Sequence, residues 1–207
     1  MSGWLKWADF LAKGGACDSL PVIGQDPQTT IYQMYTSGTT GKPKGVQVSH
    51  EGVCAFISSY VVMPNVISAK KPHLAVAPLF HAASFSLVLA AISCGRPVVV
   101  MEAFEPTAVL DSIEREAIAD ILLVPAMLSA VVATAQAHSV NLDSLERIVY
   151  GGSSISATQL EKAAKVMNCD FQQGFGMTEM VTGIIWLSPE DHQLALTSKP
   201  ELLRSCG

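Results

Sequence analysis

Short runs of β-branched and apolar residues alternate with longer helical patterns along most of the chain. The runs of strand length are residues 31–36, 74–77, 97–101, 121–124, 147–150 and 169–172. Neighbouring parallel strands need a long crossover connection, and helical patterns fill most of the gaps between these runs. The alternation therefore predicts an α/β fold with a mainly parallel sheet flanked by helices.

The clearest predicted helix begins at Ser156. Ser156 and Gln159 have the spacing of a capping box, in which the side chain of each residue binds the backbone N–H of the other. Its apolar face comprises Leu160, Ala163, Ala164 and Met167. This pattern fixes both the start of the helix and the side that it buries.

Other helices have weaker signals. Pro106 favours the first turn of a helix that directs Val109, Leu110, Ile113 and Ala117 inward. Another helix is expected over residues 126–137, and Ser49 is the expected N-cap of a helix that starts at His50. Near the start of the chain, the face of a short helix comprises Trp4, Trp7 and Leu11.

The composition excludes several classes of protein. Hydrophobic residues make up 49% of the chain and charged residues 15%, which excludes disorder. The net charge is −5 and Lys and Arg form no run, so we expect neither a nucleic-acid partner nor an anionic membrane surface. The most apolar stretch, residues 74–95, contains Pro78, His81 and three serines, so we expect no membrane span.

The five cysteines are odd in number and scattered, with no C-x-x-C pair. This argues against a disulfide framework and a zinc site. Cys54 and Cys94 lie in apolar segments, which predicts buried free thiols in a reducing compartment. Residues 1–15 lack the features of a secretory signal. We therefore expect a cytoplasmic protein.

The most informative segment is residues 35–45, YTSGTTGKPKG, which follows a predicted strand. Its glycines let backbone amides surround an anion, its hydroxyls add donors, and Lys44 adds positive charge. It is not a Walker A loop, because Lys42 is followed by Pro43. The composition indicates a phosphate-binding loop, and a flexible surface loop is the alternative.

The sequence TSGTTGKPKG resembles the signature loop of the AMP-forming adenylating superfamily, which contains acyl-CoA synthetases, luciferases and the adenylation domains of peptide synthetases. Residues 150–155 (YGGSSI) and 173–179 (QGFGMTE) resemble two further segments of that family, in the same order. The resemblance implies that the predicted α/β fold is part of the large N-terminal domain of an acyl-adenylate-forming enzyme.

The resemblance also implies roles for single residues. Lys44, Thr178 and Glu179 are the implied catalytic residues: Lys44 holds the outgoing pyrophosphate, Thr178 the phosphates and Glu179 the metal ion, Mg²⁺. The implied ATP- and AMP-binding residues are Thr36, Ser37, Gly38, Thr39, Thr40, Gly41, Lys44, Gly151, Gly152, Ser153, Gly174, Phe175, Gly176, Met177 and Thr178.

Phe175 stands where the family usually has Tyr, so a stacking face remains but a hydroxyl contact is lost. Without the resemblance, Gly151-Gly152 is an ordinary turn and Glu179 is a solvated charge at the end of a loop.

His81 is the implied acyl-substrate residue, because the matching histidine of acyl-CoA synthetases lies at the mouth of the acyl pocket. The alternative is a core histidine that binds a carbonyl. Amino-acid adenylation domains place an aspartate shortly after this point to pair the substrate amine, but residues 81–91 contain no acid. An unpaired buried amine is costly, so we expect a fatty or aryl acid.

The implied reaction uses ATP and Mg²⁺ to convert a carboxylic acid to its acyl-adenylate, and then transfers the acyl group to coenzyme A. No Thr-Gly-Asp follows Glu179, and neither a hinge nor a C-terminal lid domain fits within 207 residues. We expect residues 1–30 to form a leading helix and turn-rich linker, and residues 31–207 to be a partial AMP-binding domain, a fragment of the enzyme. The alternatives are a short noncatalytic nucleotide-binding or interaction protein and an amino-acid adenylation domain.

Overall fold

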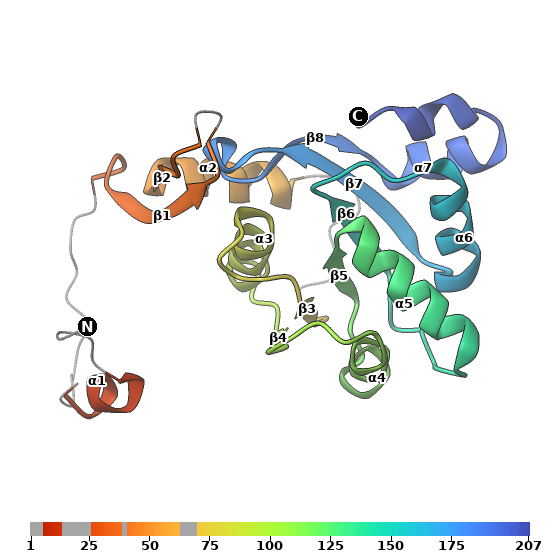
Figure 1. Ribbon diagram of the computed structural model, residues 1–207, viewed down its shortest axis with the longest axis horizontal. Helices are drawn as coiled ribbons and strands as arrows, with labels where there is room; N and C mark the ends of the chain where they lie inside the picture. Colours follow the sequence, from red (N-terminus) through yellow and green to blue (C-terminus); the bar gives the residue numbers. More distant parts are fainter. Residues whose placement is uncertain (1–5, 14–25, 39–40, 63–69) are drawn as a thin grey trace.

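The structure is a computed structural model that describes residues 6–13, 26–38, 41–62 and 70–207 (Figure 1). The helices are α1 (Trp7–Lys13), α2 (His50–Val61), α3 (Ala82–Ser93), α4 (Pro106–Glu116), α5 (Pro125–Ala137), α6 (Ala157–Met167) and α7 (Pro189–Thr197), with the 3₁₀-helices η1 (Thr178–Met180) and η2 (Pro200–Arg204). The strands are β1 (Thr30–Thr36), β2 (Lys44–Ser49), β3 (His73–Ala75), β4 (Val98–Val100), β5 (Asp120–Leu123), β6 (Arg147–Gly151), β7 (Asp170–Gly176) and β8 (Gly183–Leu187).

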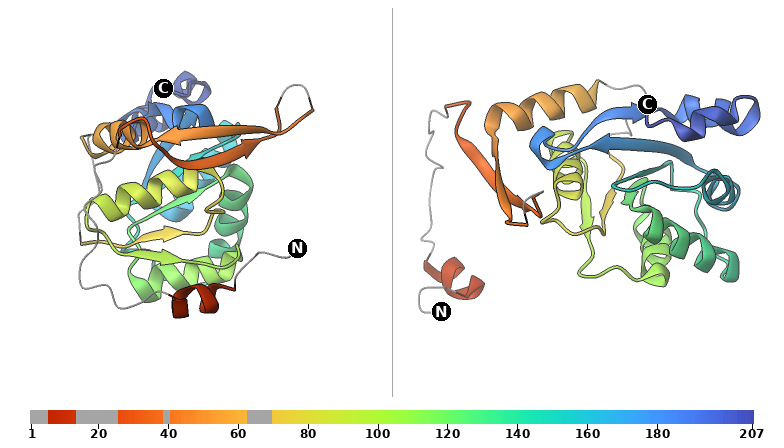
Figure 2. Two further views of the ribbon diagram at one scale, coloured as in Figure 1. Left: turned by 90° about the vertical axis from the view of Figure 1, so that its left-hand side faces the viewer. Right: turned by 45° about the horizontal axis from the view of Figure 1, so that its top comes forward.

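Six strands form one sheet in the order β4-β3-β5-β6-β7-β8. All neighbouring pairs are parallel except β7 and β8, which are antiparallel. Helices cover both faces of this sheet (Figure 2). The predicted α/β fold with a mainly parallel sheet is therefore confirmed.

Alternate residues of the central strands enter two separate cores, as the pleat of a strand requires. Ile121 and Ile148 pack with α4, α5 and α6 on one face. Leu122 and Val149 pack with α2 and α3 on the other. Because both faces are covered, the central strands consist of continuous apolar runs.

All six predicted strands are present, and five of them match the observed bounds to within two residues. The exception is β7, which continues to Gly176 because it pairs with β8, a strand that the sequence analysis did not predict. β1 also differs from the expectation, since it lies outside the main sheet. It pairs with β2 in a separate antiparallel hairpin.

The predicted starts of α2, α4 and α6 are confirmed. At the start of α6, Ser156 Oγ accepts a hydrogen bond from Gln159 N at 3.2 Å, and Gln159 Oε1 accepts one from Ser156 N at 3.2 Å. Ser49 caps α2 by accepting from the Gly52 N–H. α4 begins at Pro106, and α5 begins one residue earlier than expected.

Three expectations need correction or extension. Ala117 does not face inward: α4 ends at Glu116, and Ala117 is an exposed C-cap with a φ of 50°, which redirects the chain. Cys54 is not buried, because α2 presents it to solvent, and Cys94 is only partly buried. α7 was not predicted, although Ser188 and Asp191 form a capping box at its start.

The expected N-terminal helix is present as α1, whereas Trp4 and Cys17 lie outside the described residues.

Within the described ranges, no helix combines the length and the apolar composition that crossing a bilayer requires.

Candidate functional site

A cavity of about 380 Å³ lies where the parallel strands end at their carboxyl edge. Open α/β sheets bind ligands at this edge, and the volume is in the range of small-molecule sites. The cavity is lined by residues that follow β3, by residues in or just after β5, β6 and β7, by the start of α3 and by β8. Among the predicted site residues, it brings together His81, Gly151, Gly152, Gly174, Gly176, Met177 and Thr178.

His81 is the N-cap of α3. Its Nδ1 accepts a hydrogen bond from the Ala83 N–H at 3.3 Å, so in the neutral ring the proton is on Nε2. The side chain is exposed and lines the cavity, so the alternative of a buried core histidine is wrong. The helix cap orients a ring that still has a free N–H to offer to a ligand.

Gly151 is the last residue of β6 and Gly152 follows it. A Cβ on Gly151 would overlap the carbonyl oxygen of Gly174 in the neighbouring strand. Gly152 has a φ of 80°, in the left-handed region that favours glycine. The close approach of the neighbouring strand therefore requires glycine at position 151, and the backbone conformation favours glycine at position 152. Together the two glycines leave backbone without side chains on the cavity wall. Ser153 follows them and is exposed outside the lining.

The third motif lies on a strand and a turn, not on a loop. Its first residues extend β7 as far as Gly176, and η1 carries Thr178 and Glu179. Thr178 reaches the cavity, whereas Glu179 is exposed and does not line it. Phe175 is half exposed and also lies outside the lining. Successive residues of a strand point to opposite faces of the sheet, so Phe175 faces away from the side on which Gly174 and Gly176 line the cavity.

The first motif joins β1 to β2. Thr36 pairs with Lys44 across the hairpin. Gly38 has a φ of 64°, and a Cβ there would lie 2.4 Å from the backbone carbonyl oxygen of Lys42. Gly38 thus allows both the turn and the close approach of the Lys42 backbone. Thr39 and Thr40 lie outside the described residues. Neither Ser37, Gly41 nor Lys44 lines the cavity.

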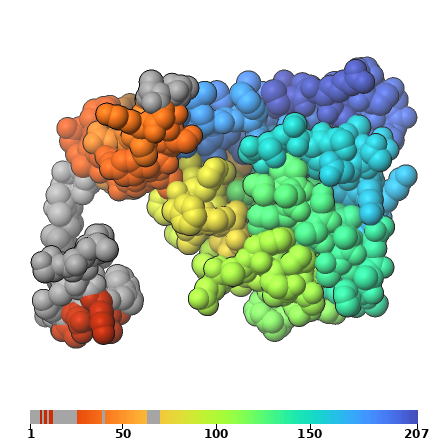
Figure 3. Space-filling model, in the orientation of Figure 1, coloured from red at the N-terminus to blue at the C-terminus, as the bar shows by residue number. Residues whose placement is uncertain are grey.

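The hairpin nevertheless lies beside the third motif, because β2 packs against η1. In Figure 3 the hairpin, in orange, lies next to the blue segment that follows β7. Val181 forms the link: its Cγ2 lies 3.6 Å from the position of a Cβ on Gly52, and it is buried in one cluster with Val48 and Val53. Val181 has a φ of 71° and a ψ of −47°, near the rare γ-turn conformation.

The charges of the site lie at its margin. Among the described residues, the cavity lining contains no Asp, Glu, Lys or Arg, whereas Lys44 and Glu179 are exposed nearby on β2 and η1. Among the described residues there is no cluster of three metal-binding side chains. Mg²⁺ that arrives with ATP needs only one or two carboxylates besides the phosphates and water, and the exposed Glu179 carboxylate fits that need.

Trp186 is a lining residue that the sequence analysis missed. It lies on β8 directly opposite Gly174. A Cβ on Gly174 would lie 2.8 Å from its Cζ3, and a Cβ on Gly183 would lie 2.8 Å from its Cζ2. The two glycines make room for the indole. Glycines on both sides of a tryptophan in the sequence were the feature from which this packing could have been predicted.

A buried ionic cluster at the opposite, amino edge of the sheet was also missed. The Asp120 carboxylate accepts a hydrogen bond from Arg96, lies 3.3 Å from His73 Nδ1, and lies 3.6 Å from an Arg147 nitrogen. Arg147 in turn donates to the Tyr60 hydroxyl at 3.0 Å. Burial raises the pKa of Tyr60 to about 12, so it stays a neutral partner.

Comparison with known proteins agrees with this geometry. Residues 4–207 match a family described as AMP-binding enzyme. The chain is 35% identical to feruloyl-CoA synthase of an Amycolatopsis species over 157 residues, which are 74% of this chain and 31% of that protein. It is 32% identical to medium/long-chain-fatty-acid–CoA ligase FadD8 of Mycobacterium tuberculosis over 201 residues, 96% of this chain and 34% of that protein.

A solved structure is similar as well. O-succinylbenzoate coenzyme A synthetase (MenE) from Bacillus subtilis, in complex with ATP and magnesium ion, superposes with a TM-score of 0.75 and 30% identity, over 88% of this chain and 37% of that chain. The chain thus spans about a third of the length of these relatives. Because the family match extends over nearly the whole sequence, the chain belongs to the AMP-binding enzyme family.

Proposed function

We propose that this chain is part of an enzyme that uses ATP to activate a carboxylic acid as an acyl-adenylate and then forms a thioester with coenzyme A. The observation that carries the proposal is the cavity at the carboxyl edge, where His81, the Gly151-Gly152 turn and Thr178 converge. The Lys44 hairpin packs against η1, the 3₁₀-helix that carries Thr178. The related CoA ligases and the ATP-bound MenE structure support the reaction and its cofactors.

The proposed roles follow from where each group lies. The bare backbone at Gly151 and Gly152 accommodates the flat adenosine, with Phe175 as a stacking face outside the cavity. Thr178 donates its hydroxyl to the phosphates, and Lys44 holds the pyrophosphate as it leaves. Glu179 holds Mg²⁺, which neutralises phosphate charge when ATP is bound. Positioning and electrostatic stabilisation are the main contributions that phosphoryl chemistry needs from a protein.

The acid binds in the cavity beside His81. The lining is mostly apolar and, in the part of the chain that the structure describes, contains no carboxylate, so a substrate ammonium group there would be buried without a partner. A fatty or aryl acid therefore fits better than an amino acid. The remaining parts of the reaction, including transfer to coenzyme A, need segments of the larger relatives that this chain does not match.

Acid-dependent exchange of pyrophosphate into ATP tests the proposal in the native protein. Lys44→Ala and Glu179→Ala should each lower the exchange rate about 100-fold, the usual effect of losing one electrostatic contact to a reacting group. Lys162→Ala and Glu161→Ala make the same charge changes on the exposed face of α6 and should leave exchange unchanged. Wild-type exchange in both site variants would refute the assignment. ATP binding without any exchange would favour the noncatalytic alternative.

A further inference from the structure

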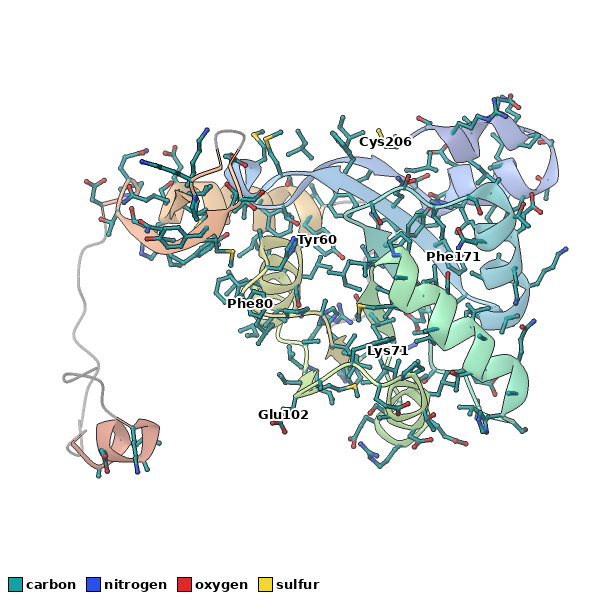
Figure 4. The ribbon with its side chains drawn as sticks, viewed as in Figure 1. Tyr60, Lys71, Phe80, Glu102, Phe171 and Cys206 are labelled. Atoms are coloured by element: carbon teal, nitrogen blue, oxygen red, sulfur yellow. The ribbon has the colours of Figure 1, made fainter. Side chains whose placement is uncertain are left out.

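The cavity has an open end and a closed end. At the open end, Phe80 is 83% exposed and Met177 is 53% exposed; Phe80 projects outward beside the start of α3 (Figure 4). At the closed end, Leu87 is 4% exposed and Val149 is 2% exposed. A ligand that enters beside His81 and Thr178 therefore extends towards Leu87 and Val149.

Trp186 lies at the closed end. It pairs with Gly174, two residues before Gly176 and thus further from the open carboxyl edge. It packs in the same cluster as Leu87 and Val149. The six-membered ring of its indole spans Gly174 and Gly183, as the contacts of its Cζ3 and Cζ2 atoms show.

Buried aromatic side chains of α2 lie behind the indole. The ring centroid of Tyr60 is 5.8 Å from that of Trp186, and Phe56 lies 5.6 Å beyond Tyr60. Both residues are buried parts of α2. Trp186 lines the cavity, whereas Tyr60 and Phe56 do not, so the size of the indole limits how deep a ligand can reach in this direction.

We propose that Trp186 is the specificity-determining end wall of the acyl cavity and restricts the substrate to compact, ring-containing acids. This inference rests on the proposed function. A flat aromatic acid finds a planar apolar surface against which its ring packs edge-to-face or offset. A long unbranched tail meets the indole and has no path into the core towards Tyr60.

The test compares wild type with Trp186→Ala and Trp186→Leu, using cinnamate as the aryl acid and octanoate and palmitate as unbranched acids. Two quantities are measured for each acid: kcat/KM for pyrophosphate exchange, and the dissociation constant in the absence of ATP. Wild type should prefer cinnamate to palmitate. Both variants should raise the ratio of palmitate to cinnamate at least about tenfold, which is the lower limit for removing steric exclusion of even one methylene group.

Ile185→Ala is the matched control, because its side chain projects to the opposite face of β8 and does not line the cavity. It should keep the wild-type ratio. An unchanged ratio in both Trp186 variants, or a wild-type preference for palmitate, overturns the inference. If cinnamate binds and the variants shift binding towards palmitate while no acid supports exchange, the end wall is confirmed and the proposed chemistry fails. Failure of cinnamate to bind wild type overturns the inference as well.

Discussion

Replacing Asp120 by Asn should destabilise the fold more than any surface charge change. Asp120 is 1% exposed, and the guanidinium groups of Arg96 and Arg147 are buried beside it. The amide removes the negative charge and leaves two cations in the interior. Breaking a buried ionic group in this way costs about 3–5 kcal/mol. A large part of the stability of an ordinary domain, about 5–15 kcal/mol, would therefore be lost.

Urea unfolding measures the effect, with a midpoint shift at constant m-value as the readout. Glu116→Gln is the control, because it makes the same carboxylate-to-amide change in an exposed pair with Arg115. That change should cost less than about 1 kcal/mol. If Asp120→Asn cost no more than the control, the cluster would contribute little and the reasoning would be wrong.

The same residue determines part of the pH dependence. Burial opposes ionisation of Asp120, but the hydrogen bonds and charges of His73 and Arg96 outweigh it and hold the pKa of this carboxyl below its ordinary value. A group with a lowered folded pKa stabilises the protein above its unfolded pKa, about 3.9 for Asp, and this stabilisation is lost as the pH falls further. The difference between wild type and Asp120→Asn should therefore shrink below about pH 4.

Two further predictions concern packing and thiol reactivity. Gly151→Ala should lower stability by about 1–3 kcal/mol, because the added methyl group overlaps the Gly174 carbonyl oxygen; an unchanged melting temperature would contradict the close approach. Burial raises the pKa of the Cys169 thiol to about 12, whereas Cys54 is exposed, so iodoacetamide at neutral pH should label Cys54 and spare Cys169 until the protein unfolds. Equal labelling of the two in the native protein, measured by mass spectrometry, would show that this burial is absent.

Much of the fold could be predicted because its signals are local. The Ser156 and Gln159 side chains act within one turn of helix, and the apolar runs of the central strands show that both faces are covered. The strand predictions were wrong where pairing with a strand elsewhere in the sequence decides the length or the place of a strand. β7 is longer than predicted because β8 pairs with it, and β1 lies in its own hairpin because β2 pairs with it.

The candidate site likewise contains residues that could be predicted from the sequence and residues that could not. Motif residues such as His81, Gly151 and Thr178 were predicted from resemblance, and the structure places them on one cavity. Trp186 has no signature, because its role depends on the cross-strand register with Gly174. The Asp120 cluster was missed for a similar reason: its members come from four separate segments. The division at residue 30 and the roles of all the candidate site residues, Lys44, His81, Thr178 and Glu179 among them, remain predictions.

The backbone conformation of Val181 makes the shape of η1 depend on the elements that pack against it. A β-branched residue at positive φ costs about 1–3 kcal/mol, and here the burial of its side chain beside Val48 and Gly52 offsets that cost. The conformation of η1 is therefore maintained from the hairpin side, although η1 is covalently continuous with β7. The same cluster contains Leu122 and Val149 of the central strands. The shape of η1, and with it the position of Thr178, therefore depends on packing contributed by β2, α2 and the sheet together.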